Sequence, residues 1–112
     1  MLTEINEENF EQIVLKAVKP IMVKYGFEEC RPCKNIVSLI EQLQSEYECE
    51  IEVYEIDTDS CTNLVKQYQI KAAPTILFFK DGVEMDRYTG YDDKTKKELK
   101  DRIDKLIQVI WT

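Results

Sequence analysis

The sequence predicts an α/β domain with a central five-stranded mixed sheet flanked by four helices. Three observations lead to this fold class. Short β-rich segments alternate with segments whose apolar residues recur at helical spacing, in the order β-α-β-α-β-α-β-β-α. The last two strands are joined by Asp81-Gly82, a dipeptide typical of a two-residue hairpin. The 112 residues suffice for one hydrophobic core, and no linker or repeat divides them, so a single domain over residues 1–112 is expected.

The N-terminal half predicts two strands, each followed by a helix. Leu2–Ile5 is a short strand candidate, and Asn6 is a suitable N-cap for a helix that reaches about Ala17. An apolar run over residues 20–27 predicts a buried strand. Pro32 then suits the first turn of a helix, because an N–H in that turn has no partner within the helix. The apolar residues of that helix recur at helical spacing: Ile36, Leu39, Ile40, Leu43 and Tyr47.

The next segments predict three more strands and one short helix. Ile51–Ile56 is rich in β-forming residues, and Ser60 could cap a short helix that follows it. Pro74 opens a strand over residues 75–80. The hairpin turn leads from there into a strand over residues 83–89, which Gly90 ends.

The last helix is expected to start at Asp92 or Asp93. Its apolar stripe consists of Leu99, Ile103, Leu106, Ile107 and Ile110. Right-handed crossovers make the first three strands parallel, and the hairpin adds two antiparallel strands. The sheet is therefore mixed, with helices on both faces, and loops that follow its strands are expected to carry the functional site.

Charge and hydropathy exclude several classes of function. The net charge of −7, from 22 acidic and 15 basic residues, argues against a nucleic-acid partner. The longest apolar run, residues 76–79, is far too short to span a bilayer, so no membrane association is expected. The acidic N-terminus lacks the apolar stretch of a signal peptide, which predicts a cytoplasmic protein. Nothing indicates an obligate oligomer, and a monomer is expected.

Cys30-Arg31-Pro32-Cys33 is the segment that points to a chemistry. Two cysteines at this spacing can close and reopen a disulfide ring with little backbone movement. A helix that begins inside the motif would stabilise a thiolate on the first sulfur through its unpaired N–H groups and the positive end of its dipole. Because the sequence has no histidine, Cys-His dyads and histidine metal sites are excluded. The motif therefore indicates redox chemistry on sulfur.

Two further cysteines, Cys49 and Cys61, lie outside the motif. They lack the second close pair that zinc ribbons use, so no metal site is expected. Cys49 stands between two glutamates, which disfavours its thiolate, and Cys61 falls near the start of a helix. A structural role is favoured for both over a second redox site.

These residues together resemble the thioredoxin family, over nearly the whole chain from about Leu2 to Ile107. The likeness rests on the two-cysteine motif followed by Lys34, on Ile56-Asp57 closing a strand and on Ala73-Pro74-Thr75 opening the next. Phe79-Lys80-Asp81-Gly82 at the hairpin and Gly90 before the last helix extend it.

The resemblance implies the thioredoxin fold and a thiol–disulfide oxidoreductase with no bound cofactor beyond the Cys30–Cys33 disulfide. It implies Cys30 as the nucleophile and Cys33 as the resolving thiol. It also implies a cis Ala73-Pro74 bond and substrate binding by Pro32, Ala73, Pro74 and Gly90. The implied partners are protein disulfides and an NADPH-dependent, flavin-containing thioredoxin reductase.

The sequence departs from the family around this motif. Glu29 stands where the family usually has tryptophan, Arg31 fills a glycine position, and Ser38 replaces a helix proline. Lys24 occupies the position of a buried aspartate that is expected to take the proton from the second cysteine.

Lys24 and Arg31 are predicted to tune the thiol pKa values. A neutral Lys24 could accept the proton of Cys33, whereas a charged one would stabilise the thiolate. Both cations favour the dithiol, so we expect a couple more oxidising than about −270 mV. The alternative is that Lys24 only packs its stem and pairs with an acid such as Glu55.

Two other functions stay open from the sequence. One keeps the chemistry but changes the partner, as a carrier dedicated to one target protein or recharged by glutathione. The other is a binding module with the same fold and no turnover, in which the cysteines are vestigial or structural.

Overall fold

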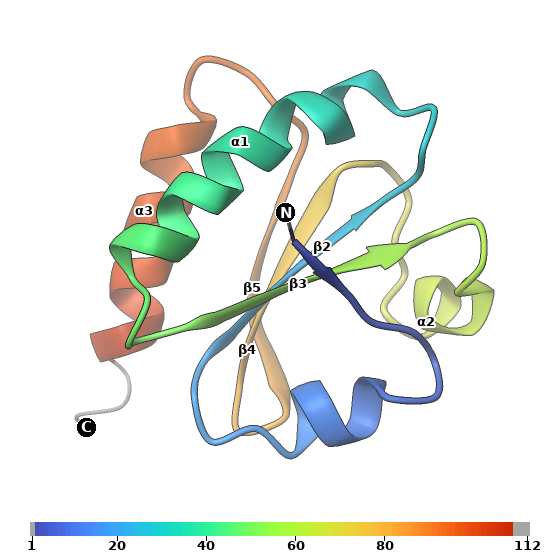
Figure 1. The fold of residues 1–112 in the computed structure, drawn as a ribbon, viewed down its shortest axis with the longest axis horizontal. Coiled ribbons are helices and arrows are strands. Elements are labelled where there is room, and N and C mark those ends of the chain that lie inside the picture. Colours follow the sequence, from blue (N-terminus) through green and yellow to red (C-terminus); the bar gives the residue numbers. More distant parts are fainter. Residues whose placement is uncertain (1, 109–112) are drawn as a thin grey trace.

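Five strands form one mixed sheet in the computed structural model, which describes residues 2–108. The strands are β1 (Thr3–Glu4), β2 (Ile21–Gly26), β3 (Glu52–Asp57), β4 (Thr75–Lys80) and β5 (Val83–Thr89). Their order across the sheet is β1-β3-β2-β4-β5 (Figure 1). β1 and β2 both run parallel to β3, whereas β4 is antiparallel to β2 and to β5. The predicted five-stranded mixed sheet is confirmed.

Four helices flank this sheet, as predicted. They are η1 (Glu11–Leu15), α1 (Arg31–Glu46), α2 (Thr62–Gln67) and α3 (Thr95–Gln108). α1 and α3 lie together on one face of the sheet, and η1 and α2 lie on the other (Figure 1). Each face has its own apolar cluster because successive side chains of a strand point to opposite sides. On β2, Met22 packs with the α1 and α3 residues, while Val23 and Tyr25 pack with the η1 and α2 residues.

The ends of three helices differ in detail from the sequence prediction. Asn6 does cap the first turn, since its Oδ1 accepts hydrogen bonds from the N–H groups of Glu8 and Asn9 at 2.9 and 3.1 Å. The helix that follows is a short π-helix, η1, rather than an α-helix that continues to Ala17. α3 begins at Thr95, later than predicted, after a turn in which Asp92 Oδ1 accepts from the Lys94 N–H. Ile110, which was assigned to the same helix, lies outside the described residues.

The cap of α2 comes from a distant segment of the chain. Cys61, not Ser60, is the N-cap residue, and its side chain makes no capping hydrogen bond. Glu7 Oε2 accepts instead from the N–H groups of Asn63 and Leu64, at 2.6 and 3.2 Å. The carboxylate also sits favourably at the positive end of the helix. Glu7 thereby fastens the N-terminal segment to α2.

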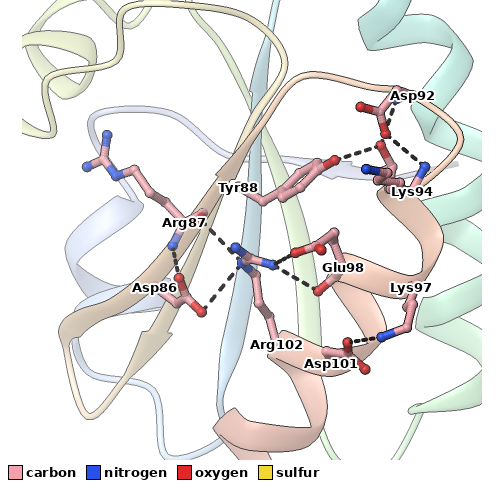
Figure 2. A network of polar contacts seen from close by, with 10 residues as sticks. Asp86, Arg87, Tyr88, Asp92, Lys94, Lys97, Glu98, Asp101 and Arg102 are labelled. Carbon is pink, nitrogen blue, oxygen red and sulfur yellow. Dashed lines mark hydrogen bonds and ion pairs between the residues drawn. The ribbon is translucent and has the colours of Figure 1, made fainter.

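A network of polar contacts fixes α3 against β5 (Figure 2). Arg102 donates to the Arg87 carbonyl at 3.3 Å and pairs with the carboxylates of Asp86 and Glu98. Its guanidinium also lies 5.1 Å from the centre of the Tyr88 ring, in cation–π geometry. The network docks the last helix at the β5 edge of the sheet.

Candidate active site

Both cysteines of the motif lie at the N-terminus of α1, directly after β2 and a three-residue loop. Cys30 is the N-cap residue of the helix, and Pro32 occupies its first turn, as predicted. Cys30 Sγ accepts a hydrogen bond from the Cys33 N–H at 3.2 Å. The first turn contains no acidic side chain, so the positive end of the helix acts on Cys30 without a competing anion there. This arrangement supplies the features that stabilise a thiolate at a helix N-terminus.

Cys30 and Cys33 are joined by a disulfide, with their Cα atoms 5.2 Å apart. Cys30 is 6% exposed and Cys33 only 1%. The sulfur at the helix cap is thus the more accessible of the two. The difference suits a division of labour between an attacking thiol and a sheltered one.

Charged side chains surround the accessible end of the motif. Glu28 and Glu29 in the preceding loop are exposed, and so is Arg31 in the first turn of α1. Lys34, one turn along the helix, is exposed as well. Because these side chains are exposed, solvent weakens the effect of their charges on the sulfurs.

The start of β4 lies at the same end of the sheet as the cysteines. Thr75 pairs with Tyr25, which immediately precedes Gly26 at the end of β2. The Ala73-Pro74 peptide bond is cis, as the resemblance implied. Pro74 is buried, its carbonyl accepts from the Gly90 N–H at 2.8 Å, and Gly90 has a φ of +97°. Pro74 and Gly90 therefore lie together at this end of the sheet. The neighbouring Ala73 is half-buried.

Lys24 points to the α1 face of the sheet and is buried, with only 8% of its side chain exposed. Its Nζ donates to Glu55 Oε1 at 2.9 Å, and the Glu55 side chain is 27% exposed. The two residues are direct neighbours in the parallel β2–β3 pairing. Glu55 is thus the acidic partner that the sequence analysis named under the alternative role of Lys24, in which its stem packs and its charge is paired. The pairing itself is compatible with either role for Lys24.

Gly26 lets Cys33 and Lys24 approach the same point. A Cβ at residue 26 would lie 2.8 Å from Cys33 Sγ and 3.2 Å from Lys24 Cε. The first of these distances is closer than side-chain atoms tolerate, so the position requires glycine while Cys33 stays where it is. The sequence reasoning did not identify Gly26. Its place at the end of a buried strand, four residues before Cys30, was the available signal.

A pocket of about 350 Å³ opens beside the sheltered cysteine. Its lining includes Cys33, Gly26, Lys24, Glu55 and Val37. The acidic residues Glu4, Glu28 and Asp57 and the basic residue Lys34 also line it. Cys33 therefore borders a cavity large enough for water, although the residue itself is buried.

Two remaining cysteines stay apart from this site as free thiols, Cys49 exposed and Cys61 buried. Within residues 2–108, no group of three or more histidine, cysteine, aspartate or glutamate residues is arranged to hold a metal ion. Among the same residues, no helix has the length and apolar character needed to cross a bilayer.

Fold and site together define the class of protein: an α/β domain that carries a disulfide at the head of the helix after its central strand, beside a cis-proline loop. The thioredoxin family model matches residues 1–105, and the chain belongs to the thioredoxin family. Its cysteine pair conforms to the two-residue spacing of that family.

Plant and bacterial proteins are among the relatives of this chain. The chain is 35% identical over 104 residues to "Thioredoxin M-type, chloroplastic" of Spinacia oleracea, which covers 93% of this chain and 56% of the relative. It is 32% identical over 95 residues to "Thioredoxin C-2" of Corynebacterium nephridii, covering 85% of this chain and 88% of the relative. Against "Thioredoxin 1" of Synechococcus elongatus the identity is 29% over 91 residues. The chain spans only a little over half the length of the spinach protein.

Proposed function

We propose that this protein is a thiol–disulfide oxidoreductase that reduces protein disulfides through exchange at Cys30 and Cys33. The observation that carries the proposal is the Cys30–Cys33 disulfide at the N-terminus of α1, with the more accessible sulfur as the helix cap. Family membership supports the same chemistry. The proposed cycle needs no bound cofactor, because the electrons reside in the two thiols.

The reaction consists of two exchanges. The Cys30 thiolate attacks a sulfur of the substrate disulfide, and the substrate's other sulfur leaves as a thiolate. The Cys33 thiolate then attacks Cys30 Sγ, which releases the second substrate thiol and closes the Cys30–Cys33 disulfide. Pro32, Ala73, Pro74 and Gly90 form the proposed substrate surface. The Ala73 backbone would pair there with an extended substrate segment as an added strand.

The partners are part of the proposal. A thioredoxin reductase is the proposed electron donor, with the protein acting as a monomer in the cytoplasm. A compartment in which thiols are kept reduced suits a carrier that must return to the dithiol after each turnover. Acidic net charge makes a nucleic-acid partner unfavourable.

One observation favours a dedicated carrier as the second candidate. The exposed charged residues next to the cysteines are Glu28, Glu29, Arg31 and Lys34, so a partner meets a patch of mixed charge. Such a patch can select one partner through complementary charges and repel others. A dedicated carrier, or one recharged by glutathione, would use the same two-step exchange.

Catalytic reduction of insulin disulfides, with dithiothreitol as the donor, tests the proposal. Wild type and Cys49→Ser are expected to accelerate insulin precipitation equally, whereas Cys30→Ser is expected to be inactive. Equal activity in wild type and Cys30→Ser would contradict the oxidoreductase and favour the binding module. A coupled assay with NADPH and a bacterial thioredoxin reductase then distinguishes the general carrier, which supports NADPH oxidation, from the dedicated or glutathione-linked one, which does not.

A further inference from the structure

The side chain of Glu55 has no role in the two exchanges described so far, yet it lies in the pocket beside Cys33. We propose that Glu55 accepts the proton that Cys33 must lose before it attacks Cys30, while Lys24 stays charged and stabilises the resulting thiolate. The inference rests on the proposed oxidoreductase function and assigns a residue to its second step.

Three elements bring the participants together. Cys33 comes from the first turn of α1, Lys24 from β2 and Glu55 from β3. The missing side chain at Gly26 places Cys33 Sγ and the Lys24 stem against the same point. Glu55 Oε1 accepts from Lys24 Nζ at 2.9 Å, and all three side chains line the one pocket. A proton can thus pass from the sulfur to the carboxylate through pocket water.

Lys24 itself is poorly suited to take the proton. An ammonium group has three donors and no acceptor, and Lys24 Nζ already donates to Glu55 Oε1 at 2.9 Å. The charged Lys24 instead serves as a fixed cation that stabilises whichever neighbouring group is anionic. Before proton transfer that anion is the Glu55 carboxylate, and after it the Cys33 thiolate. The buried ammonium keeps one counterion throughout, which avoids an unpaired buried charge.

The other carboxylates of the pocket are less suited than Glu55. Glu4 and Glu28 are exposed. Asp57 is engaged in the turn after β3, where its Oδ1 accepts from the Asp59 N–H at 3.0 Å and its Oδ2 from Ser60 Oγ at 3.3 Å. Glu55 lines the pocket, and within residues 2–108 its hydrogen bond to Lys24 is made through Oε1. Its partial exposure also lets it return the proton to solvent.

The resolving step balances without any further reactant. In the mixed disulfide, Cys30 Sγ is bonded to the substrate sulfur and Cys33 is a thiol. The Cys33 proton moves to Glu55, and the new thiolate forms a bond to Cys30 Sγ. The bond between Cys30 and the substrate breaks, and its electron pair leaves on the substrate sulfur, which is protonated from solvent. Glu55 then releases its proton to solvent, so the two cysteines are oxidised and the substrate is reduced.

Stopped-flow reaction of the reduced protein with 5,5′-dithiobis(2-nitrobenzoate) tests this step separately from the first. Attack by Cys30 releases one chromophore in a phase whose rate rises with reagent concentration. Resolution by Cys33 releases the second in a phase that is independent of reagent concentration. All variants carry Cys49→Ser, because the exposed third thiol would add a signal of its own.

Glu55→Gln is expected to slow the resolving phase by about a hundredfold near pH 6, the low end of what a positioned proton acceptor contributes. The attack phase is expected to stay within about twofold, since Glu55 plays no part in it. The deficit shrinks toward pH 9, where hydroxide takes the proton, whereas a purely structural defect would persist at every pH. Glu55→Asp keeps a carboxylate and is expected to recover part of the rate.

Glu52→Gln is the matched control, because it removes the same charge from the same strand at a residue outside the pocket. Its resolving rate is expected to equal that of wild type. An unchanged or faster resolving phase in Glu55→Gln would overturn the inference, since Lys24 without its carboxylate would then assist the thiolate alone. Equal slowing in Glu52→Gln would also overturn it. A wild-type protein that shows neither phase would instead contradict the proposed function itself.

Discussion

Two groups of charged side chains lie on the α1 and α3 face of the sheet, and they differ in how fully they are satisfied. Arg102 is held at the β5 edge by two carboxylates, a backbone carbonyl and the Tyr88 ring (Figure 2). Lys24, near the end of β2, has one carboxylate partner within residues 2–108 and lines a pocket large enough to hold water. We call the contacts of Arg102 the saturated network, because its guanidinium has several partners that hold it in one arrangement. A single ion pair next to a pocket, by contrast, can exchange its anion. The Arg102 contacts therefore suit a structural role, and the Lys24–Glu55 pair suits a role in the reaction.

The largest expected effect comes from adding a methyl group at Gly26 in the pocket, and the same change at the crowded Gly82 of the β4–β5 hairpin is its control. In Gly26→Ala the new Cβ would meet Cys33 Sγ at 2.8 Å, and in Gly82→Ala it would meet the Leu15 carbonyl oxygen at 2.7 Å. Each is expected to lower the free energy of unfolding by about 1–3 kcal/mol, measured by urea denaturation. Only Gly26→Ala is expected to slow disulfide exchange. Equal exchange rates in the two variants would show that residue 26 has no special link to Cys33.

Removing the centre of the saturated network is expected to affect stability alone. Arg102→Met loses the cation–π contact and the ion pairs, which are partly exposed, so the expected loss is about 1–2 kcal/mol. Lys97→Met breaks an exposed pair with Asp101 on the same helix and should leave the free energy of unfolding nearly unchanged. Insulin reduction by both folded variants should match wild type. A loss of activity in Arg102→Met would place this network in the function after all.

Removing the cation of the pocket pair is expected to change the redox potential. Lys24→Met takes away a charge that stabilises the dithiol form, so the midpoint potential should fall by about 30 mV, which corresponds to roughly 1.4 kcal/mol. Wild type should lie above about −270 mV. Equilibration with glutathione or dithiothreitol buffers measures both values. Lys80→Met, at the distant hairpin, is the control, and a Lys24→Met potential equal to wild type would assign Lys24 to packing only.

Alkaline pH is expected to lower stability through two tyrosines that lie outside the pocket beside Cys33. Desolvation, and then a hydrogen bond to Asp104, raise the pKa of Tyr47 to about 12; desolvation, and then a hydrogen bond to Glu52, raise the pKa of Tyr54 likewise to about 12. Because the folded protein holds these protons more tightly than an unfolded chain with a tyrosine pKa of about 10, stability should fall between about pH 10 and 12.

Urea denaturation at pH 9 and pH 11 measures this loss. The double variant Tyr47→Phe, Tyr54→Phe cannot ionise at these positions, so its stability should decline less over the same interval. A decline as steep as that of wild type would assign the alkaline loss to other groups. Burial also raises the pKa of Tyr25, which should leave part of the decline in the double variant.

Much of the fold was predictable because its signals are local. Apolar periodicity, β-rich runs and cap residues indicated the approximate position of each strand and helix described within residues 2–108, and Asp81-Gly82 indicated the hairpin. The cap of α2 was not predictable in this way, because Glu7 reaches Asn63 from the other end of the chain. The π-helical form of η1 likewise has no sequence signal that we can identify.

The functional site was likewise predictable only where its signals are local in the sequence. The position of the cysteines at a helix start follows from Pro32 and the motif itself. The sequence offered Glu55 as an acidic partner for Lys24, and the structure confirms this pair. The close approach of Cys33 to Gly26 was not foreseen, because it depends on how α1 packs over the end of β2. Contacts between elements decide such distances, and no local pattern encodes them.

The account depends most on a thiolate at the cap of α1, and alkylation of the reduced protein by iodoacetamide tests this directly. Mass spectrometry of each cysteine between pH 5 and 10 gives its rate as a function of pH. We predict that Cys30 reacts fastest at pH 7, with a rate that reaches half its maximum well below pH 8.5, the ordinary thiol midpoint. Exposed Cys49 is the internal reference. A Cys30 rate no higher than that of Cys49, with a midpoint at 8.5 or above, would contradict the account.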